Sequence, residues 1–474
     1  MENLHKFYIN GAWVSPDSTV TMPVINPANE QVVATVALGN ANDVDRAVAA
    51  ASQAFETFSM TSKQERLALL ERIKQVTEAR FEDLAQAMRE EMGAPITFSR
   101  EAQADAAIGH LQGFVDALER LEEEVDLGNG ELLVREPIGV CGLITPWNWP
   151  INQIALKVLP ALAAGCTCVL KPSEHTPLSA IIYAEILHEA GCPPGVFNLV
   201  NGEGPEVGAA MSQHPDIQMM SFTGSTRAGT AVTRDSAESV KRVTLELGGK
   251  SANLVFADSD LEERVQNAVA ECMANTGQSC DAPTRLLVER SCYDQVVEIA
   301  RQATIATRVG DPVQEGDHIG PLFDRIQFDR VQTLIGVGID EGANLLVGGL
   351  GKPEGFETGW YVKPTLFTDV HNQMRIAREE VFGPVLVVIP FDTEEEAIAI
   401  ANDSPYGLAA YLQTGDPARA RRVARQLRAG AVHVNGGVYE YGSPFGGYKQ
   451  SGNGREGGMM GLEDYLETKM LHGM

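Results

Sequence analysis

The segment Gly139-Val140-Cys141-Gly142-Leu143-Ile144 decides the fold class of this 474-residue chain, because it is a short apolar stretch that predicts a β-strand. A helical pattern follows over residues 151–162, and Cys168-Val169-Leu170 predicts the next strand. Residues 197–200 and 219–222 continue the alternation. This order of elements predicts an α/β fold with a parallel sheet covered by helices.

Residues 42–118 carry the apolar periodicity of long amphipathic helices. Asn42-Asp43 and Thr61-Ser62 are the predicted N-caps of two of them, and a third pattern runs from about 98 to 121. Thr176-Pro177 predicts a later helix that starts with a capping hydroxyl followed by proline.

A second α/β region is predicted after Gly248, with strands near residues 252–256, 285–288 and 385–390. The chain as a whole shows no internal repeat and no low-complexity linker, so we expect its domains to be interwoven in sequence rather than arranged one after another.

Two extended segments stand apart from this alternation. Gly128-Asn129-Gly130 is a turn signal that predicts a hairpin over residues 119–137. Residues 463–470, near the end of the chain, are also predicted to be extended.

The composition is that of an ordinary soluble protein, with 44% apolar and 21% charged residues in a length that suits about three domains. The net charge of −27 argues against nucleic acid and against an anionic membrane as partners, because both require clustered Lys and Arg. The apolar run over residues 151–170 is broken by Lys157 and Pro160, and the first residues lack the apolar stretch of a signal peptide.

The seven cysteines are scattered and include no C-x-x-C pair, so we predict no disulfide framework and no zinc site. The nine histidines are also dispersed, which predicts no metal centre. These features fit a reducing compartment, and we expect a cytoplasmic protein.

Cys280 is the candidate nucleophile. A lone cysteine is most often a small buried apolar residue. Cys280, however, follows Gly277-Gln278 in irregular backbone after a helix predicted over residues 261–274, whereas Cys166 and Cys168 belong to an apolar strand. A cysteine in a polar, glycine-containing loop is the better candidate for a reactive thiol.

The chain resembles the aldehyde dehydrogenase superfamily, of the bacterial catabolic type, over essentially its whole length. The resemblance rests on four motifs: Pro146-Trp147-Asn148, Phe222-Thr223-Gly224-Ser225-Thr226, Glu246-Leu247-Gly248-Gly249-Lys250 and Asn275-Thr276-Gly277-Gln278-Ser279-Cys280. It implies a Rossmann-type dinucleotide-binding domain, a catalytic domain and a small β arm that makes a homodimer or homotetramer. The implied boundaries are 1–118 with 138–247 for the first, 248–450 for the second, and 119–137 with 451–474 for the arm.

The resemblance also implies a reaction. The Cys280 thiolate adds to an aldehyde, and the Asn148 side chain and the backbone N–H of Cys280 stabilise the resulting oxyanion. After hydride transfer to NAD, Glu246 activates the water that hydrolyses the thioester. Glu246 lies between apolar residues before a Gly-Gly pair, so we expect it to be half-buried at a strand end. Lys157 and Glu456 are expected to carry protons away from this base, although Lys157 could instead extend its amine to solvent.

The cofactor site is predicted partly from local chemistry. Gly224-Ser225 lie where a strand passes into a helix, and the backbone N–H groups of such a turn suit a phosphate. In residues 201–208 the third glycine comes one position too late for the dinucleotide fingerprint G-x-G-x-x-G.

The resemblance extends the cofactor site. It implies that Lys171, Ser173 and Glu174 bind the adenosine ribose, with Glu174 repelling a 2′-phosphate, so that NAD is preferred and NADP is the weaker cofactor. The remaining residues that it implies for the cofactor are Ile144, Trp147, Gly204, Glu380 at the nicotinamide ribose, and Phe382.

The substrate pocket is less defined. Asn152, Gln153 and Leu156 are expected to line the aldehyde tunnel, with Tyr439, Glu440 and Tyr441 at its mouth. Relatives that oxidise succinate semialdehyde carry arginine at the position of Leu156, so a short carboxylated substrate is disfavoured. The tyrosines suit an aromatic or extended aldehyde. Asp281, next to the nucleophile, is less usual in the family and leaves the tuning of the thiolate open.

Two other functions stay open from the sequence. A coenzyme A-acylating dehydrogenase is one, although such relatives lack a glutamate at the position of Glu246. A non-catalytic binding or structural protein that reuses the fold is the other, and the presence of Cys280, Glu246 and Asn148 counts against it.

Overall fold

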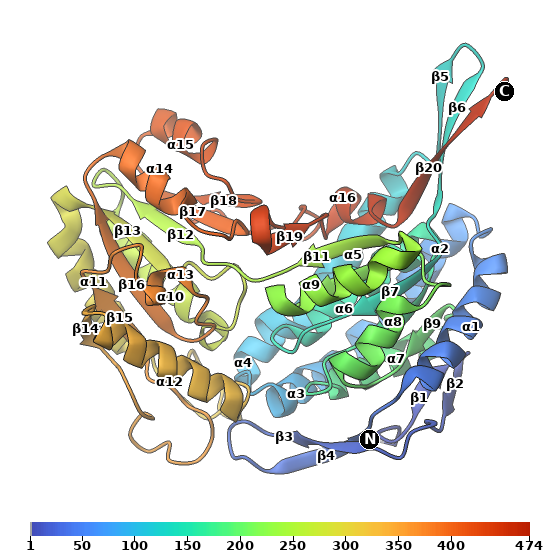
Figure 1. Cartoon of the computed structure of the whole chain (residues 1–474), viewed down its shortest axis with the longest axis horizontal. Coiled ribbons are helices and arrows are strands. Elements are labelled where there is room, and N and C mark those ends of the chain that lie inside the picture. Colours follow the sequence, from blue (N-terminus) through green and yellow to red (C-terminus); the bar gives the residue numbers. More distant parts are fainter. Residues whose placement is uncertain (1) are drawn as a thin grey trace.

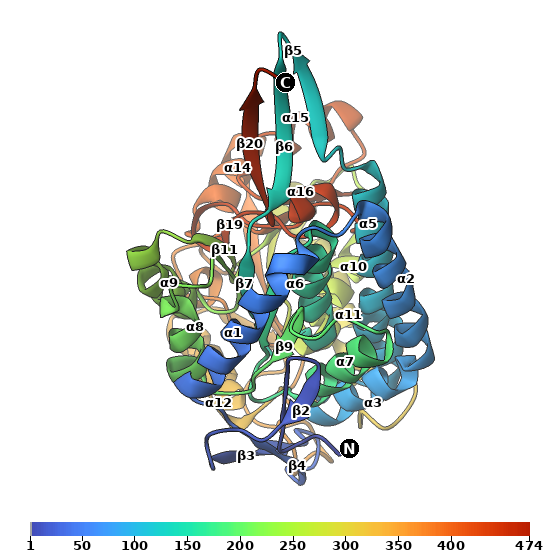
Figure 2. The ribbon, with the colours of Figure 1, turned by 90° about the vertical axis from the view of Figure 1, so that its right-hand side faces the viewer.

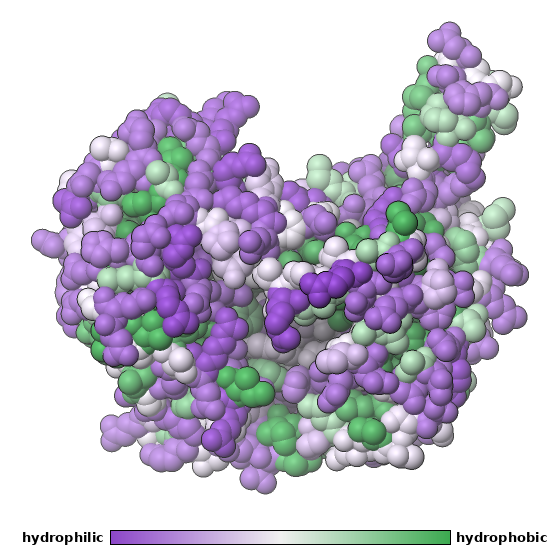
Figure 3. Space-filling view, in the orientation of Figure 1, coloured by the Kyte–Doolittle hydropathy of each residue, from purple (hydrophilic) through white to green (hydrophobic). Residues whose placement is uncertain are grey.

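The computed structural model describes residues 2–474 and shows two α/β lobes with a narrow arm that projects from one of them (Figure 1). An eight-stranded sheet forms the first lobe and a seven-stranded sheet forms the second. The space-filling view of the same face shows a hollow where the lobes meet (Figure 3).

The first sheet joins parallel central strands to short outer ones. Its strands in spatial order are β19 (Gly452–Asn453), β11 (Arg242–Glu246), β10 (Met219–Thr223), β7 (Val140–Ile144), β8 (Thr167–Lys171), β9 (Phe197–Leu199), β1 (Phe7–Ile9) and β2 (Ala12–Val14). Strands β7, β8 and β10 are buried along their whole length, as expected for parallel strands covered on both faces.

Alternate residues of this sheet enter two separate cores. Cys141 and Leu143 of β7 pack into a core with the helices on one face, whereas Val140 packs into a core with the helices on the other. The helices of this lobe are α1 (Ala41–Phe58), α2 (Lys63–Ala79), α3 (Phe81–Glu91), α4 (Ile96–Phe98), α5 (Asp105–Arg120), α6 (Pro150–Ala164), α7 (Leu178–Glu189), α8 (Ala209–Gln213) and α9 (Thr226–Ser236). The predicted α/β fold, with a parallel sheet covered by helices, is therefore confirmed.

The register of the parallel strands places their carboxyl ends at one edge. Ile144 lies opposite both Lys171 of β8 and Phe222 of β10, and Thr223 lies opposite Glu246 of β11. Ligands of open α/β sheets bind outside this edge. The edge therefore brings together sequence motifs that are far apart along the chain.

The second lobe repeats this layering. Its strands in spatial order are β14 (Asn344–Val347), β15 (Thr365–Thr368), β16 (Val385–Phe391), β13 (Arg285–Glu289), β12 (Ala252–Val255), β17 (Ala409–Gln413) and β18 (Ala431–Val434). Its helices are α10 (Leu261–Met273), α11 (Tyr293–Ala306), α12 (Arg325–Asp340), α13 (Arg375–Arg378), α14 (Glu394–Asn402) and α15 (Pro417–Ala424). The three strands predicted for this region are confirmed as β12, β13 and β16.

The arm is a three-stranded antiparallel sheet that extends beyond the helices as a thin ribbon (Figure 2). Its strands are β5 (Glu124–Gly128), β6 (Glu131–Pro137) and β20 (Leu466–His472). Gly128, Asn129 and Gly130 all have positive φ, which explains why this turn needs glycine and asparagine. The predicted terminal extension is confirmed, except that it begins after α16 (Gly458–Glu463). Because β19 joins the first sheet, the terminal segment contributes to two sheets.

A separate two-stranded sheet pairs β3 (Thr21–Ile25) with β4 (Val32–Ala37).

Two predicted helix caps are wrong. Asn40, not Asn42, caps α1, in a capping box with Asp43. Thr176 makes no cap for α7; instead the buried carboxylate of Glu91 accepts hydrogen bonds from the first N–H groups of that helix. Glu91 lies 87 residues away along the chain, so local sequence could not reveal it. The predicted Ser62 cap of α2 is confirmed.

The helical region before the arm is also more divided than predicted. The sequence pattern missed α3, and the pattern over residues 98–121 is a π-helical turn, Ser99–Ala104, followed by α5. Within residues 2–474, none of the helices combines the length and apolar character that crossing a membrane requires.

Candidate active site

A cavity of about 150 Å³ lies at the carboxyl edge of the first sheet, where the second lobe faces it. Its lining includes these residues predicted for the reaction and for the cofactor: Trp147, Asn148, Gly224, Ser225, Glu246, Cys280, Glu380 and Phe382. Strand ends of the first lobe and loops of the second therefore meet in one site.

The loop that carries Cys280 is strained. Asn275 and Thr276 have φ values of 52° and 58°, in the left-handed region that β-branched residues rarely adopt. Such strain persists only where surrounding contacts enforce it, and it is common at active sites. Thr276 donates to the carbonyl of Gly320 at 3.2 Å, and the indole of Trp149 donates to Ser279 at 2.9 Å.

Cys280 lines the cavity, and the residue as a whole is partly exposed. Burial raises its pKa well above the usual range, and the negative charges of Asp281, Glu380 and Glu246 raise it further. A thiol with a raised pKa is protonated at neutral pH, so its attack on a carbonyl requires a nearby proton acceptor.

Asp281 supplies the first of these charges. Replacing it with asparagine is expected to lower the pKa of Cys280, because a negative charge beside the thiolate is removed. The pH profile of single-turnover NADH formation should then shift to lower pH. Rapid mixing over a range of pH, with the exposed Asp294→Asn on α11 as control, would measure the shift. An unchanged profile would show that Asp281 does not tune the thiol.

Glu246 is the last residue of β11 and is only 4% exposed, so it is more buried than predicted. Neither carboxylate oxygen has a hydrogen-bond partner among residues 2–474. Burial, and then the nearby Glu456, raises its pKa well above the usual range, while Lys157 opposes this rise. A buried carboxyl group with a raised pKa is suited to accept a proton.

Lys157 is fully buried on α6, so it does not extend to solvent. Its amine donates to the Thr223 hydroxyl at 2.7 Å and forms an ion pair with Glu456. One ammonium group therefore lies among two buried carboxyl groups, those of Glu456 and Glu246, in an arrangement that can share protons.

The Asn148 side chain lines the cavity and donates from Nδ2 to the carbonyl of Gln278 at 3.0 Å. This hydrogen bond fixes the amide beside the loop of the nucleophile. An amide held in this way can present its second hydrogen to an oxyanion.

The residues predicted for the adenosine ribose lie along the same strand edge but outside the 150 Å³ cavity. Lys171 is buried, and its amine donates to Glu174 at 3.0 Å and to the carbonyl of Pro172 at 2.8 Å. The Ser173 hydroxyl accepts from the backbone N–H of His175. Gly204 opens a π-helical turn, Gly204–Gly208, that approaches Ile144 and Lys171 at its far end.

Gly224 and Ser225 form the predicted turn between a strand, β10, and a helix, α9. Ser225 is the N-cap of α9 and accepts from the backbone N–H of Ala228 at 3.3 Å. The first N–H groups of this 11-residue helix have no partner within the helix, and Gly224 and Ser225, which precede them, line the cavity.

Glu380 and Phe382 close the cavity from the second lobe. Glu380 accepts from the backbone N–H of Gly249 at 3.0 Å, and burial raises its pKa to about 7. Phe382 has a left-handed φ of 58°, and its ring meets the Trp147 ring edge-on at 5.4 Å.

Sequence reasoning missed Gln327 and Arg330, which also line the cavity. Gln327 donates to the carbonyl groups of Val381 and Phe382, and Arg330 donates to that of Glu380. Both lie on α12, about 50 residues before their partners, and nothing in the α12 pattern distinguishes them from ordinary polar positions.

Only part of the predicted substrate tunnel reaches this cavity. Gln153 lines it, whereas Asn152 accepts a hydrogen bond from the ring of the buried His110 at 2.7 Å. The Tyr441 ring meets the His110 ring at 4.9 Å, and Tyr439 also packs near it. Asn152 and the two tyrosines therefore form one wall with α5.

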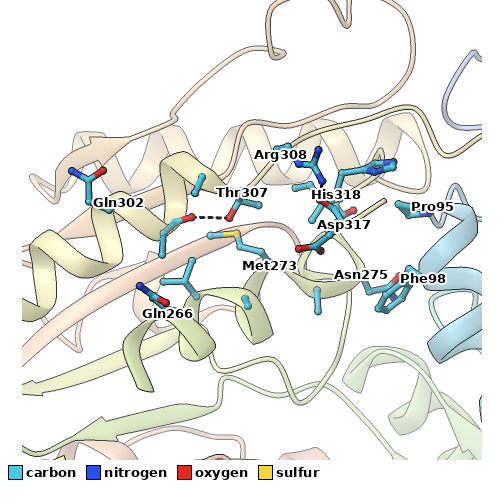
Figure 4. Close-up of a pocket in the computed structure, with 17 residues that line it drawn as sticks. Pro95, Phe98, Gln266, Met273, Asn275, Gln302, Thr307, Arg308, Asp317 and His318 are labelled. Atoms are coloured by element: carbon cyan, nitrogen blue, oxygen red, sulfur yellow. Dashed lines mark hydrogen bonds between the residues drawn. The ribbon is translucent and has the colours of Figure 1, made fainter. Parts of the chain in front are cut away.

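A larger groove of about 750 Å³ lies between α10, the end of α11 and residues 317–319 (Figure 4). Asn275 lies toward one end of it near Phe98, and Arg308 and His318 lie close together (Figure 4). Thr276 also lines the groove. Within the described chain, no residue predicted for the reaction or for the cofactor lines this groove. The smaller cavity is therefore the candidate active site.

Known proteins resemble this chain in sequence and in structure. The model of the aldehyde dehydrogenase family matches residues 13–471. The chain is 52% identical over 474 residues to 3-succinoylsemialdehyde-pyridine dehydrogenase of a Pseudomonas species, covering 100% of this chain and 99% of that protein. The crystal structure of an aldehyde dehydrogenase from Bartonella henselae is 49% identical and superposes with a TM-score of 0.98 over 100% of both chains.

A second solved structure contains ligands. Aldehyde dehydrogenase C of Pseudomonas syringae, as a cysteine-to-alanine mutant with NAD+ and octanal, is 52% identical with a TM-score of 0.98. The match covers 99% of this chain and 97% of that one.

Proposed function

The chain belongs to the aldehyde dehydrogenase family, and from that premise we propose that Cys280 and Glu246 convert an aldehyde to a free carboxylic acid in two steps. The protein is an NAD-dependent aldehyde dehydrogenase. The observation that carries the proposal is the buried, unpaired carboxyl group of Glu246 in the same cavity as the Cys280 thiol and the Asn148 amide, all within the described residues.

In the first step the sulfur of Cys280 forms a bond to the carbonyl carbon. The thiol gives up its proton to solvent as this bond forms, because Cys280 is partly exposed, and Glu246 is left for the second step. The Asn148 amide and the backbone N–H of Cys280 stabilise the oxyanion, a type of interaction whose loss costs about 10²- to 10³-fold in rate.

The residues present fit the cofactor. The start of α9 offers N–H groups for a phosphate, Lys171 and Glu174 offer a donor and an acceptor for a ribose, and Glu380 borders the cavity beside Cys280. The chemistry that NAD supplies when bound is acceptance of the hydride from the tetrahedral carbon. The Glu174 carboxylate disfavours a 2′-phosphate by charge repulsion, so we infer that NADP is the weaker cofactor.

In the second step Glu246 accepts a proton from water as the water oxygen bonds to the thioester carbon. The carbon–sulfur bond breaks, the acid leaves and the thiolate of Cys280 is restored. Glu456 and Lys157 provide a route by which the proton leaves Glu246, because their buried ion pair lies beside it. A coenzyme A-acylating enzyme has no use for this base, so hydrolysis is the favoured outcome.

The substrate is proposed to be an uncharged aldehyde with an aromatic or extended apolar group. Leu156 is buried and apolar, Tyr439 and Tyr441 form a wall, and Glu440 is exposed next to them, where it disfavours anions. Two relatives are consistent with this class: one is named for a pyridine-bearing semialdehyde, and the other was solved with octanal.

Assembly through the arm is also proposed. The outer edges of β5 and β20 carry unpaired backbone groups, and Leu127 and Met470 are exposed apolar residues on these strands. Such edges tend to pair with another chain, so we propose a homodimer or homotetramer. The cysteines of the described chain are all free, which is consistent with a cytoplasmic location.

The proposed function is tested by NADH formation over a panel of aliphatic, aromatic and carboxylated aldehydes, with and without coenzyme A. We expect turnover without coenzyme A, a carboxylic acid product, and the highest kcat/KM for octanal-length and aromatic aldehydes. A strict requirement for coenzyme A would overturn the hydrolytic mechanism. Equal kcat/KM for all simple aliphatic aldehydes would remove the basis for the substrate class.

A further inference from the structure

We propose that Gln103 is a positioning residue for the oxyanion site, acting through Asn148 and Asn275. This inference rests on the proposed role of Asn148 and extends it to a residue that does not touch the substrate. It is carried by a network of buried amide side chains that joins a π-helical turn of the first lobe to the loop of the nucleophile.

Gln103 lies in the π-helical turn Ser99–Ala104, between α4 and α5. Turns of this kind are rare, are costly to form and occur often at functional sites. The turn directs Gln103 into the interior, where it is fully buried. A fully buried glutamine in a helical segment requires partners for its amide.

The partners of Gln103 are all acceptors. Its Nε2 donates to the backbone carbonyl of Asn148 at 3.0 Å, and it lies 3.4 Å from Oδ1 of Asn275 and 3.8 Å from Sδ of Met92. Because carbonyl oxygen and thioether sulfur accept hydrogen bonds, the amino end of the amide must face them. Its Oε1 has no hydrogen-bond partner in the part of the chain that the structure describes, so only the donor end is used.

Asn275 completes the network. Its Nδ2 donates to the carbonyl of Asn148 at 2.9 Å and to that of Gln278 at 3.2 Å. The carbonyl of Gln278 is also the acceptor for the Asn148 side chain. Asn148 is thus held at its backbone by Gln103 and Asn275, and at its amide by the loop that ends in Cys280.

In this geometry Gln103 holds the backbone of Asn148 and the side chain of Asn275 in position. Without the donor of Gln103, Asn275 loses one of the contacts that orient its amide, and the Asn148 carbonyl keeps only one of its two donors. The Asn148 amide can then move relative to the thiol. Small displacements of a catalytic group lower a rate by up to about 10²-fold even when the mutation is remote from the chemistry.

Gln103→Met tests this role, because methionine has a similar length and fills the same space without a donor. We expect the rate of single-turnover NADH formation to fall by about 10- to 100-fold, with the Kd for NAD unchanged. Gln112→Met, an exposed position on α5, is the matched control and should keep the wild-type rate. Each rate of NADH formation is divided by the amplitude of the NADH burst, which measures the concentration of active enzyme. A smaller fraction of folded protein therefore does not lower the normalised rate.

A double-mutant cycle separates positioning from a merely structural role. If Gln103 acts through Asn148, the methionine substitution should slow the wild type but cause no further slowing in an Asn148→Ala background. Equal slowing in both backgrounds, or no slowing in the wild type, would overturn the inference. If the methionine variant does not fold, Gln103→Asn keeps an amide one methylene shorter and is expected to give the same pattern.

The same cycle distinguishes failure of the oxyanion role of Asn148 from failure of the positioning role of Gln103. An Asn148→Ala enzyme with the wild-type rate would remove the proposed oxyanion role and the role of Gln103 with it. If Asn148→Ala lowers the rate of single-turnover NADH formation but Gln103→Met does not, only the role of Gln103 is contradicted.

Discussion

Cys280→Ala is expected to abolish NADH formation with every aldehyde while leaving NAD binding intact. The substitution removes the only thiol in the cavity lining, and loss of the catalytic nucleophile of a serine protease costs about 10⁶-fold in kcat. Steady-state turnover and NAD titration by fluorescence would measure the two effects. The methyl group of alanine leaves the left-handed backbone of Asn275 and Thr276 unchanged, so the loss should be chemical rather than structural.

Cys292→Ala is the matched control, because this thiol is buried at the start of α11 and lies outside the cavity lining. It should retain wild-type turnover. Residual activity of the Cys280→Ala enzyme above a few per cent would show that the thiol is not the nucleophile. Loss of NAD binding in the same enzyme would show instead that the substitution disturbs the cofactor site.

Glu246→Gln is expected to separate the two steps of the reaction. Glutamine preserves the shape of the side chain but cannot accept a proton from water, so the thioester should accumulate. Enzyme mixed with aldehyde and NAD should release a first equivalent of NADH and then slow by about 10²- to 10⁴-fold. Mass spectrometry of the stalled protein should show the acyl group on Cys280.

The pH dependence of the wild type should agree with this role. Because the pKa of Glu246 is raised, its carboxyl group is protonated at low pH, and hydrolysis should become faster as pH rises through that pKa. The matched control is Glu289→Gln, since Glu289 ends β13 as Glu246 ends β11 but binds only backbone and serine groups. A Glu246→Gln enzyme with full steady-state turnover would refute the assignment.

The sequence predicts the fold well where burial dominates. Strands β7, β8 and β10 are continuous apolar runs, because each is covered on both faces, and such runs are recognisable without tertiary information. The active-site motifs are also recognisable, because Cys280 and Glu246 each lie in glycine-containing backbone next to a polar loop. The parallel register of the first sheet places Glu246 opposite Thr223, whereas Cys280 reaches the same cavity on a loop of the second lobe.

Other features depend on contacts between distant segments. Glu91 caps α7 from 87 residues away, and Gln327 holds the backbone of Val381 from 54 residues away. Neither pairing leaves a periodic or local signal. Gln103 was missed for the same reason, since its partners lie 45 and 172 residues further along the chain.

The chain order of the site bears on how the protein is made. Lys157 and its partner Glu456 are 299 residues apart, and β20, which closes the arm against β6, is the last strand of the chain. At about 5–20 residues per second, a ribosome needs about 15–60 s to extend the nascent chain from the lysine to its carboxylate. Until then Lys157 lacks its ion-pair partner, and the backbone groups of β6 that later pair with β20 are free to pair with other nascent chains. Catalytic competence is therefore expected only after Glu456 and β20 have been synthesised, and a chain that lacks residues 455–474 should be both inactive and prone to association.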